Sequence, residues 1–149
     1  LNYLLNSKIN ELLPPFVNLG TLGFNFGMQG VQFTATSTTA ESQMLSNPMY
    51  VHSIPNNNDN QDIVSMGTNS AVIARKVIEN GFQVMAIHMM AVTQAIDLLP
   101  EEKRAKLSSK TKEIYSGIRG IVPMINEDVA QFENILEVTK KLRNTKLEL

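Results

Sequence analysis

The sequence predicts an all-α protein, a bundle built around one long helix. From about residue 64 to residue 99, apolar side chains cover nearly the whole circumference of a helix. Shorter segments on both sides carry apolar residues at helical spacing and end near prolines. We find no segment with the alternation of apolar and polar residues that is typical of a half-buried strand.

Two helices are expected early in the chain. Residues 2–12 carry leucine and isoleucine at helical spacing, and Pro14 and Pro15 end the segment because proline does not continue a helix. An apolar loop with glycines and phenylalanines follows. Residues 31–46 form a weakly amphipathic helix. The run from Thr34 to Thr39 lowers its helix propensity, but the small side chains permit close packing.

Three more helices are expected after a polar loop, over 64–99, 108–122 and 126–142. A solvated, charged turn over 100–104 separates the first two, and Pro123 separates the last two. Asn126 is a good amino-terminal cap for the last helix, because two acids follow it near the positive end of the helix dipole.

Composition excludes several classes of function. A net charge of −1 argues against a nucleic-acid partner, and without cysteine neither a disulfide nor a thiolate metal site can form. We therefore expect no metal site, and a cytoplasmic protein. No formal charge occurs between Asn80 and Ile96, but several amides and a histidine are distributed through that stretch. A central bundle helix is favoured over a membrane span.

Charged residues are scarce in the first 100 positions, which hold 6 acids and 3 bases, whereas the remaining positions hold 8 acids and 10 bases. A surface so poor in solvating groups should be covered by other protein. The chain also begins without Met, inside a predicted helix. We therefore expect a fragment of a longer, oligomeric protein.

Few residues indicate chemistry by themselves. His88 lies between Ile87 and Met89 and is interpreted as a core histidine. His52 has no second ligand at metal-binding spacing. The dense run of amides within 56–62 has two interpretations: an exposed loop, or a set of neutral hydrogen-bonding groups presented to a ligand. The residues alone leave both open.

Six motifs follow one another along the chain: Leu13-Pro14-Pro15-Phe16, Thr39-Ala40-Glu41-Ser42, Ser53-Ile54-Pro55, Asn60-Gln61-Asp62-Ile63-Val64-Ser65-Met66-Gly67, Gln94-Ala95-Ile96-Asp97, and Arg119 with Val122-Pro123. Their content and order resemble the histidine and phenylalanine ammonia-lyase family. The resemblance covers essentially the whole chain, which makes it more specific than any single motif.

The resemblance implies an enzyme that eliminates ammonia from an aromatic amino acid, with this chain as its carboxyl-terminal third. Members of the family form homotetramers of long helices, and several subunits contribute to each active site. Their electrophile is a methylidene-imidazolone (MIO) group made from an internal Ala-Ser-Gly. That motif is absent here, so the group would form in the missing upstream part. We expect the isolated chain to be inactive.

By the same resemblance, Gln61 matches the position that faces the substrate and the prosthetic group, which implies a catalytic role, and its neighbour Asn60 a substrate-binding role. Asp62 is expected to cap the long helix. Histidine lyases usually carry Gln-Glu-Asp here, whereas phenylalanine and tyrosine lyases and aminomutases more often carry Asn-Gln-Asp, as this chain does. The flanking residues look more like histidine enzymes.

Histidine, converted to urocanate, is therefore the default substrate. The alternative is a phenylalanine or tyrosine ammonia-lyase or aminomutase. From another class, the chain could be a non-catalytic helical oligomerisation module.

Overall fold

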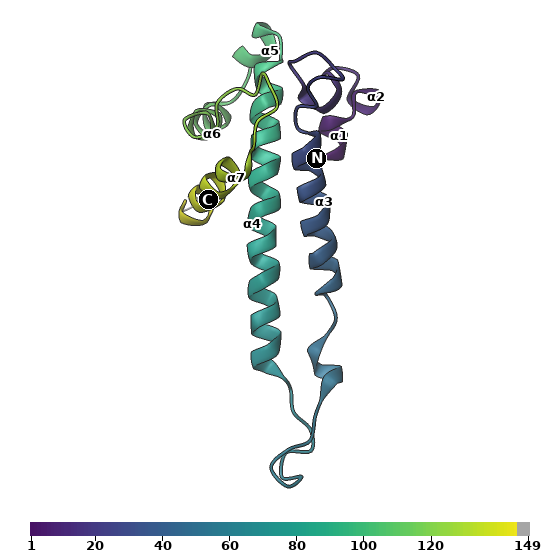
Figure 1. Ribbon diagram of the computed structural model, residues 1–149. Helices are drawn as coiled ribbons and strands as arrows, with labels where there is room; N and C mark the ends of the chain where they lie inside the picture. Colours follow the sequence, from purple (N-terminus) through teal and green to yellow (C-terminus); the bar gives the residue numbers. More distant parts are fainter. Residues whose placement is uncertain (146–149) are drawn as a thin grey trace.

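The computed structural model describes residues 1–145, which form helices and turns without any strand. Its elements are α1 (Asn2–Leu5), α2 (Ser7–Asn10), η1 (Pro15–Val17), α3 (Gln29–Met44), η2 (Met49–His52), α4 (Gly67–Asp97), α5 (Glu101–Ala105), α6 (Ser109–Arg119) and α7 (Phe132–Asn144). Helices α3 and α4 form a long antiparallel hairpin, and α6 and α7 lie beside the carboxyl-terminal half of α4 (Figure 1). The expected all-α fold class is confirmed.

The single helix predicted over 2–12 is wrong, because the structure breaks it at Asn6. The backbone of Asn6 is extended, and its side chain accepts a hydrogen bond of 3.0 Å from the Lys8 backbone N–H. The Asn10 amide donates to the carbonyls of Leu4 at 3.1 Å and Asn6 at 2.8 Å. Side-chain amides therefore take up backbone groups that a continuous helix would pair internally.

Helix α3 forms despite its hydroxyl-rich sequence, and three of the hydroxyls bond to the helix itself and so leave the backbone hydrogen bonds of the helix in place. Thr36, Thr39 and Ser42 each donate to the carbonyl four residues earlier, at 2.9, 2.8 and 3.1 Å. The helix also bonds across to α4, where the Thr38 hydroxyl donates to the Gln83 side-chain oxygen at 3.0 Å. Small residues thus bring the two helices of the hairpin close together.

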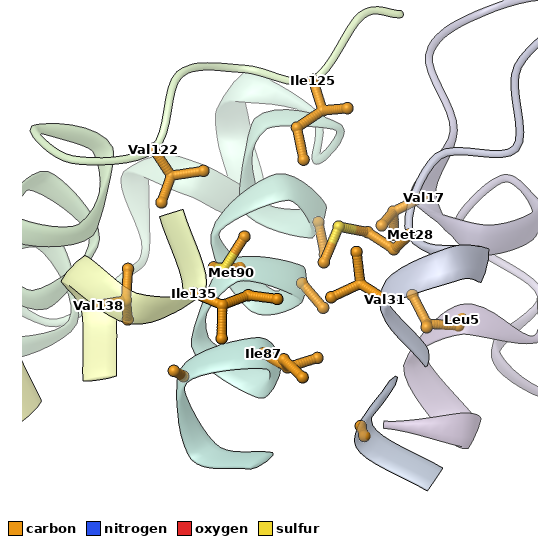
Figure 2. Packing of buried hydrophobic residues seen from close by; sticks show 14 of the residues in the cluster. Leu5, Val17, Met28, Val31, Ile87, Met90, Val122, Ile125, Ile135 and Val138 are labelled. Carbon is orange, nitrogen blue, oxygen red and sulfur yellow. The ribbon is translucent and has the colours of Figure 1, made fainter. Parts of the chain in front are cut away.

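The core lies around the carboxyl-terminal half of α4. Ile87 and Met90 are buried there, with Val31 of α3 on one side and Ile135 and Val138 of α7 on the other (Figure 2). No helix within residues 1–145 is long and apolar enough to cross a membrane.

The amino-terminal half of α4 has a different environment. Most of its residues from Gly67 to Met85 are exposed or only half-buried, and Ile78 is 59% exposed. Phe33 and Met44 of α3 are similarly exposed. The sequence predicts apolar cover along the whole helix, and within this chain only the carboxyl-terminal half receives it.

The last helix begins at Phe132, so the predicted start at Asn126 is wrong. The carboxylate of Asp128 accepts hydrogen bonds from the backbone N–H groups of Phe26 at 2.8 Å and Gly27 at 3.0 Å. The acid expected near the helix start thus ties the last connection to the early apolar loop. A second correction is α5, a short exposed helix in the place of the solvated turn expected over 100–104.

Candidate functional site

The predicted site residues lie in the loop between α3 and α4, at the far end of the hairpin from α5 and α6 (Figure 1). The base of this loop is closed by a hydrogen bond of 2.8 Å from the Val64 backbone N–H to the Ser53 hydroxyl. Residues 54–63 beyond this bond are all exposed. The loop therefore projects from the hairpin without burying a side chain in this chain.

The tip of the loop is a tight turn that ends at Gln61. Asn56 and Gln61 exchange both backbone hydrogen bonds, at 3.0 and 3.3 Å, as an antiparallel pair does. Inside this pair, the Asn60 N–H donates to the Asn57 carbonyl at 3.1 Å. The turn places Asn60 and Gln61 next to each other with exposed side-chain amides.

The chemistry available from the side chains of Asn60 and Gln61 is hydrogen bonding rather than proton transfer. A glutamine or asparagine amide donates through nitrogen and accepts through oxygen, but it does not ionise near neutral pH. Among residues 1–145, no three or more histidine, cysteine or acidic side chains gather as they would around a metal ion. These two amides are suited to binding the polar groups of a ligand through both donors and acceptors.

The expected capping role of Asp62 is wrong. Helix α4 begins at Gly67, its N-cap position is Met66, and no side-chain hydrogen bond caps it. Met66 has a left-handed backbone with φ of 52°, which turns the chain from the loop into the helix. This conformation is uncommon for a side chain without a local hydrogen-bonding group.

His88 lies far from this tip, in the carboxyl-terminal half of α4. It is half-buried between Ile87 and Met89, and burial lowers the pKa of its imidazole. His88 therefore lies at the edge of the core, and not inside it as the interpretation of a core histidine required.

At the carboxyl-terminal end of α4, a network of polar side chains joins this helix to α6 and to the segment that follows α6. Arg119 donates from Nε to Asp97 at 2.9 Å, from Nη1 to the Val122 carbonyl at 2.8 Å, and from Nη2 to Gln94 at 2.9 Å. The Tyr115 hydroxyl also donates to Asp97. The side chains of Asp97 and Arg119 are 5% and 15% exposed, so this ion pair is largely shielded from water.

The same network fixes the connection between α6 and α7. Gln94 donates to the Ile125 carbonyl at 2.9 Å and accepts from the Ile125 N–H at 3.2 Å. The motif that ends α4, with Gln94 and Asp97, therefore contacts the motif that ends α6, with Arg119 and Val122. We call this network of hydrogen bonds the polar lock. The spacing of the two motifs in sequence carries no sign of this contact, which only the fold reveals.

A groove of about 720 Å³ lies between α3, α4 and the start of α7. Its lining is mainly apolar and includes the exposed rings of Phe33 and Phe132. Gln61 and Asn60 are not among its lining residues. The groove and the loop tip are therefore separate features of the surface.

Comparisons with known proteins agree with this geometry. A family model described as aromatic amino acid lyase matches residues 1–120. The chain is 36% identical over 128 residues to the MIO-dependent tyrosine 2,3-aminomutase of Streptomyces globisporus, covering 86% of this chain and 23% of that protein. It is 34% identical over 149 residues to the histidine ammonia-lyase of Clostridium tetani, covering 99% of this chain and 28% of that protein.

A solved structure shows the same fold. The crystal structure of histidine ammonia-lyase from Trypanosoma cruzi matches with a TM-score of 0.85 and 31% identity, covering 95% of this chain and 27% of that one. The chain thus spans about a quarter of the length of the relatives that it matches. The family model covers most of the chain, including the Asn60–Gln61 tip and, from the polar lock, Gln94, Asp97 and Arg119, and the chain therefore belongs to the aromatic amino acid lyase family.

Proposed function

We propose that this chain is the carboxyl-terminal part of an ammonia-lyase that eliminates ammonia from an aromatic L-amino acid, with histidine as the default substrate and urocanate as the product. The observation that carries the proposal is the Asn60–Gln61 amide pair, exposed at the tip of a closed loop in a member of this family. Similarity to the Clostridium tetani histidine ammonia-lyase along the whole chain supports the choice of substrate.

In this proposal Gln61 binds and orients the substrate, and the base that takes the substrate proton lies in another part of the enzyme. Elimination removes a proton from the carbon next to the one that carries the amino group, and a base must accept it. A glutamine amide cannot do so near neutral pH. The base and the remaining walls of the site would come from parts of the enzyme beyond these 149 residues.

The electrophile that activates the amino acid would be supplied by an MIO group formed outside this chain, since no Ala-Ser-Gly occurs in it. The residues at the tip fit such a neighbour. Asn60 and Gln61 offer neutral donors and acceptors to a ring carbonyl or to a substrate carboxylate. Neither brings a charge that would have to be buried when other subunits close around the loop.

We further propose that the complete enzyme is a cytoplasmic homotetramer without nucleic-acid or membrane partners. The exposed apolar side chains of α3 and of the first half of α4 support the assembly, because a monomer rarely leaves such an area uncovered. Ile78, Phe33 and Met44 belong to this area. Light scattering of the complete enzyme measures its assembly directly.

A second candidate is a tyrosine or phenylalanine ammonia-lyase, or an aminomutase that returns the ammonia to the neighbouring carbon. The observation that favours it is the identity of residue 61, where this chain has glutamine and histidine lyases usually have glutamate. The similarity to a tyrosine 2,3-aminomutase points the same way. A non-catalytic helical module is the candidate from another class.

The test uses the complete enzyme with histidine, phenylalanine and tyrosine, each product being identified. An unsaturated acid indicates a lyase, a β-amino acid indicates an aminomutase, and no turnover of any of the three would support the non-catalytic module. On the preferred substrate we expect Gln61→Ala to lower kcat by about 100-fold, as the loss of one well-placed donor typically does.

The matched control is Asp59→Asn, two residues earlier in the same turn. Asp59 has φ of 61°, and asparagine tolerates this left-handed backbone, so the variant removes a charge without distorting the turn. We expect its kcat to stay within about twofold of the parent, as exposed substitutions usually allow. An equal loss in both variants would place the site elsewhere.

A further inference from the structure

The turn that ends at Gln61 has an unusual backbone. Asn57, Asn58 and Asp59 have φ of 56°, 52° and 61°, three left-handed residues in series without a glycine among them. L-residues visit this region mainly as single residues, and asparagine and aspartate are the ones that do so at the lowest cost. The amide-rich sequence of the loop thus matches a specific backbone requirement.

We infer that Asn57, Asn58 and Asp59 are positioning residues, whose left-handed backbone sets the direction of the Gln61 side chain. The inference rests on the function proposed above. Both backbone groups of Gln61 are bound to Asn56, so its side chain leaves the backbone in a direction fixed by that pair. The pair can form only if the three residues before Asn60 bend the chain back sharply enough.

Among residues 1–145, no side-chain hydrogen bond or ion pair connects residues 54–63 to another element. Residues 54–63 are all exposed, so no packing against α3 or α4 holds them. The bond between Val64 and the Ser53 hydroxyl closes only the base of the loop, several residues below the tip. The direction of Gln61 therefore depends on the local conformational preference of residues 57–59.

Because the tip is exposed, a change there can alter the direction of Gln61 without altering the stability of the fold. Because the tip buries no apolar surface in this chain, a change that unfolds only the turn should leave the helices of the hairpin intact. Loss of turnover without loss of stability is therefore the expected signature of the positioning role.

The test compares two double variants in the complete enzyme. In Asn57→Gly with Asn58→Gly, both positions still adopt positive φ freely. In Asn57→Val with Asn58→Val, the β-branched side chains disfavour that region strongly. We expect the valine pair to lower kcat by at least about tenfold, while the glycine pair stays within about threefold. The melting temperature and the oligomeric mass should be the same in all three proteins.

A double-mutant cycle with Gln61→Ala then separates this inference from the proposed function. If the turn acts through Gln61, adding the valine pair to Gln61→Ala should cause little further loss of kcat. A valine pair with parental kcat, while Gln61→Ala is slow, overturns the positioning role and leaves the proposed function standing. Equal losses in the glycine and valine pairs also overturn it, because the side chains rather than the backbone would then matter. A Gln61→Ala enzyme with parental kcat overturns the positioning role and the role of Gln61, while its continued turnover leaves the proposed reaction standing.

Discussion

Replacing Arg119 by lysine should release the connection between α6 and α7 from the end of α4. In the structure one guanidinium reaches Asp97, Gln94 and the Val122 carbonyl at the same time. Lysine keeps the positive charge, but its single ammonium lacks the rigid fork that spans three acceptors. We expect it to keep the contact with Asp97 and to lose the other two.

The magnitude follows from the two lost bonds. A hydrogen bond from a charged donor contributes roughly 1.5–3 kcal/mol when it is shielded from water. Two such bonds give about 3 kcal/mol for the local opening of this connection at the lower end of that range. A change of this size corresponds to a population of the open form that is on the order of 100-fold larger.

Hydrogen exchange of the Ile125 amide in the complete enzyme measures this opening, because that amide donates to Gln94 within the same network. Arg75→Lys is the matched control, since Arg75 pairs with Glu79 at 3.2 Å and its side chain is 82% exposed. Exposed pairs of this kind contribute little, so exchange at Ile125 should change by less than about twofold. If Arg119→Lys has no larger effect than Arg75→Lys, the network does not hold the connection.

Two further predictions concern the early loop and the pH dependence of the lock. Gly27→Ala should destabilise the fold more than Gly23→Ala. Both glycines have positive φ, but only at Gly27 would a new Cβ lie 2.9 Å from backbone atoms. Thermal unfolding should therefore give Gly27→Ala the lower melting temperature. Equal melting temperatures would mean that the loop gives way without cost. The hydrogen bond to Asp97 is the largest cause that raises the pKa of Tyr115 above its ordinary value of 10.0. Its contribution to stability should therefore be complete below pH 10.0 and lost as the pH rises through the raised value, so the parent should lose stability there more steeply than Tyr115→Phe in alkaline unfolding curves. Parallel curves would exclude a role for this ionisation.

The sequence predicts the helices where long-range packing and local preference agree. The apolar circumference of α4 and the proline near the end of α6 locate these elements to within a few residues. The prediction of helix boundaries fails where a polar side chain bonds to a distant backbone group instead of to its own helix. Asn10 binds the carbonyls of α1 instead of continuing one helix, and Asp128 binds the early loop instead of starting α7. Both choices depend on groups that sequence spacing does not bring together.

The candidate site was predicted from motif resemblance rather than from physical patterning. A run of amides is compatible with any exposed loop, and only the order of the motifs singles out Gln61. The positive φ values of residues 57–59 are consistent with their asparagine and aspartate side chains, but the sequence does not show that the turn would close on Gln61. The sequence does not predict the network around Arg119, because its partners lie on two helices whose mutual packing no sequence pattern specifies.

Because α4 is long, a small tilt at one end produces a large displacement at the other. Its 31 residues span about 46 Å, with the polar lock at one end and the loop that carries Gln61 beyond the other. A tilt of about one degree at the locked end would move the far end by about 0.8 Å, more than the roughly 0.5 Å within which a catalytic group must be held. Bonds to α3 at Lys76, Asn80 and Gln83 hold the middle of α4, but its first turns next to the loop are exposed within this chain. The exposed first turns of α4 are therefore where another part of the enzyme has to make contact to hold the loop in place.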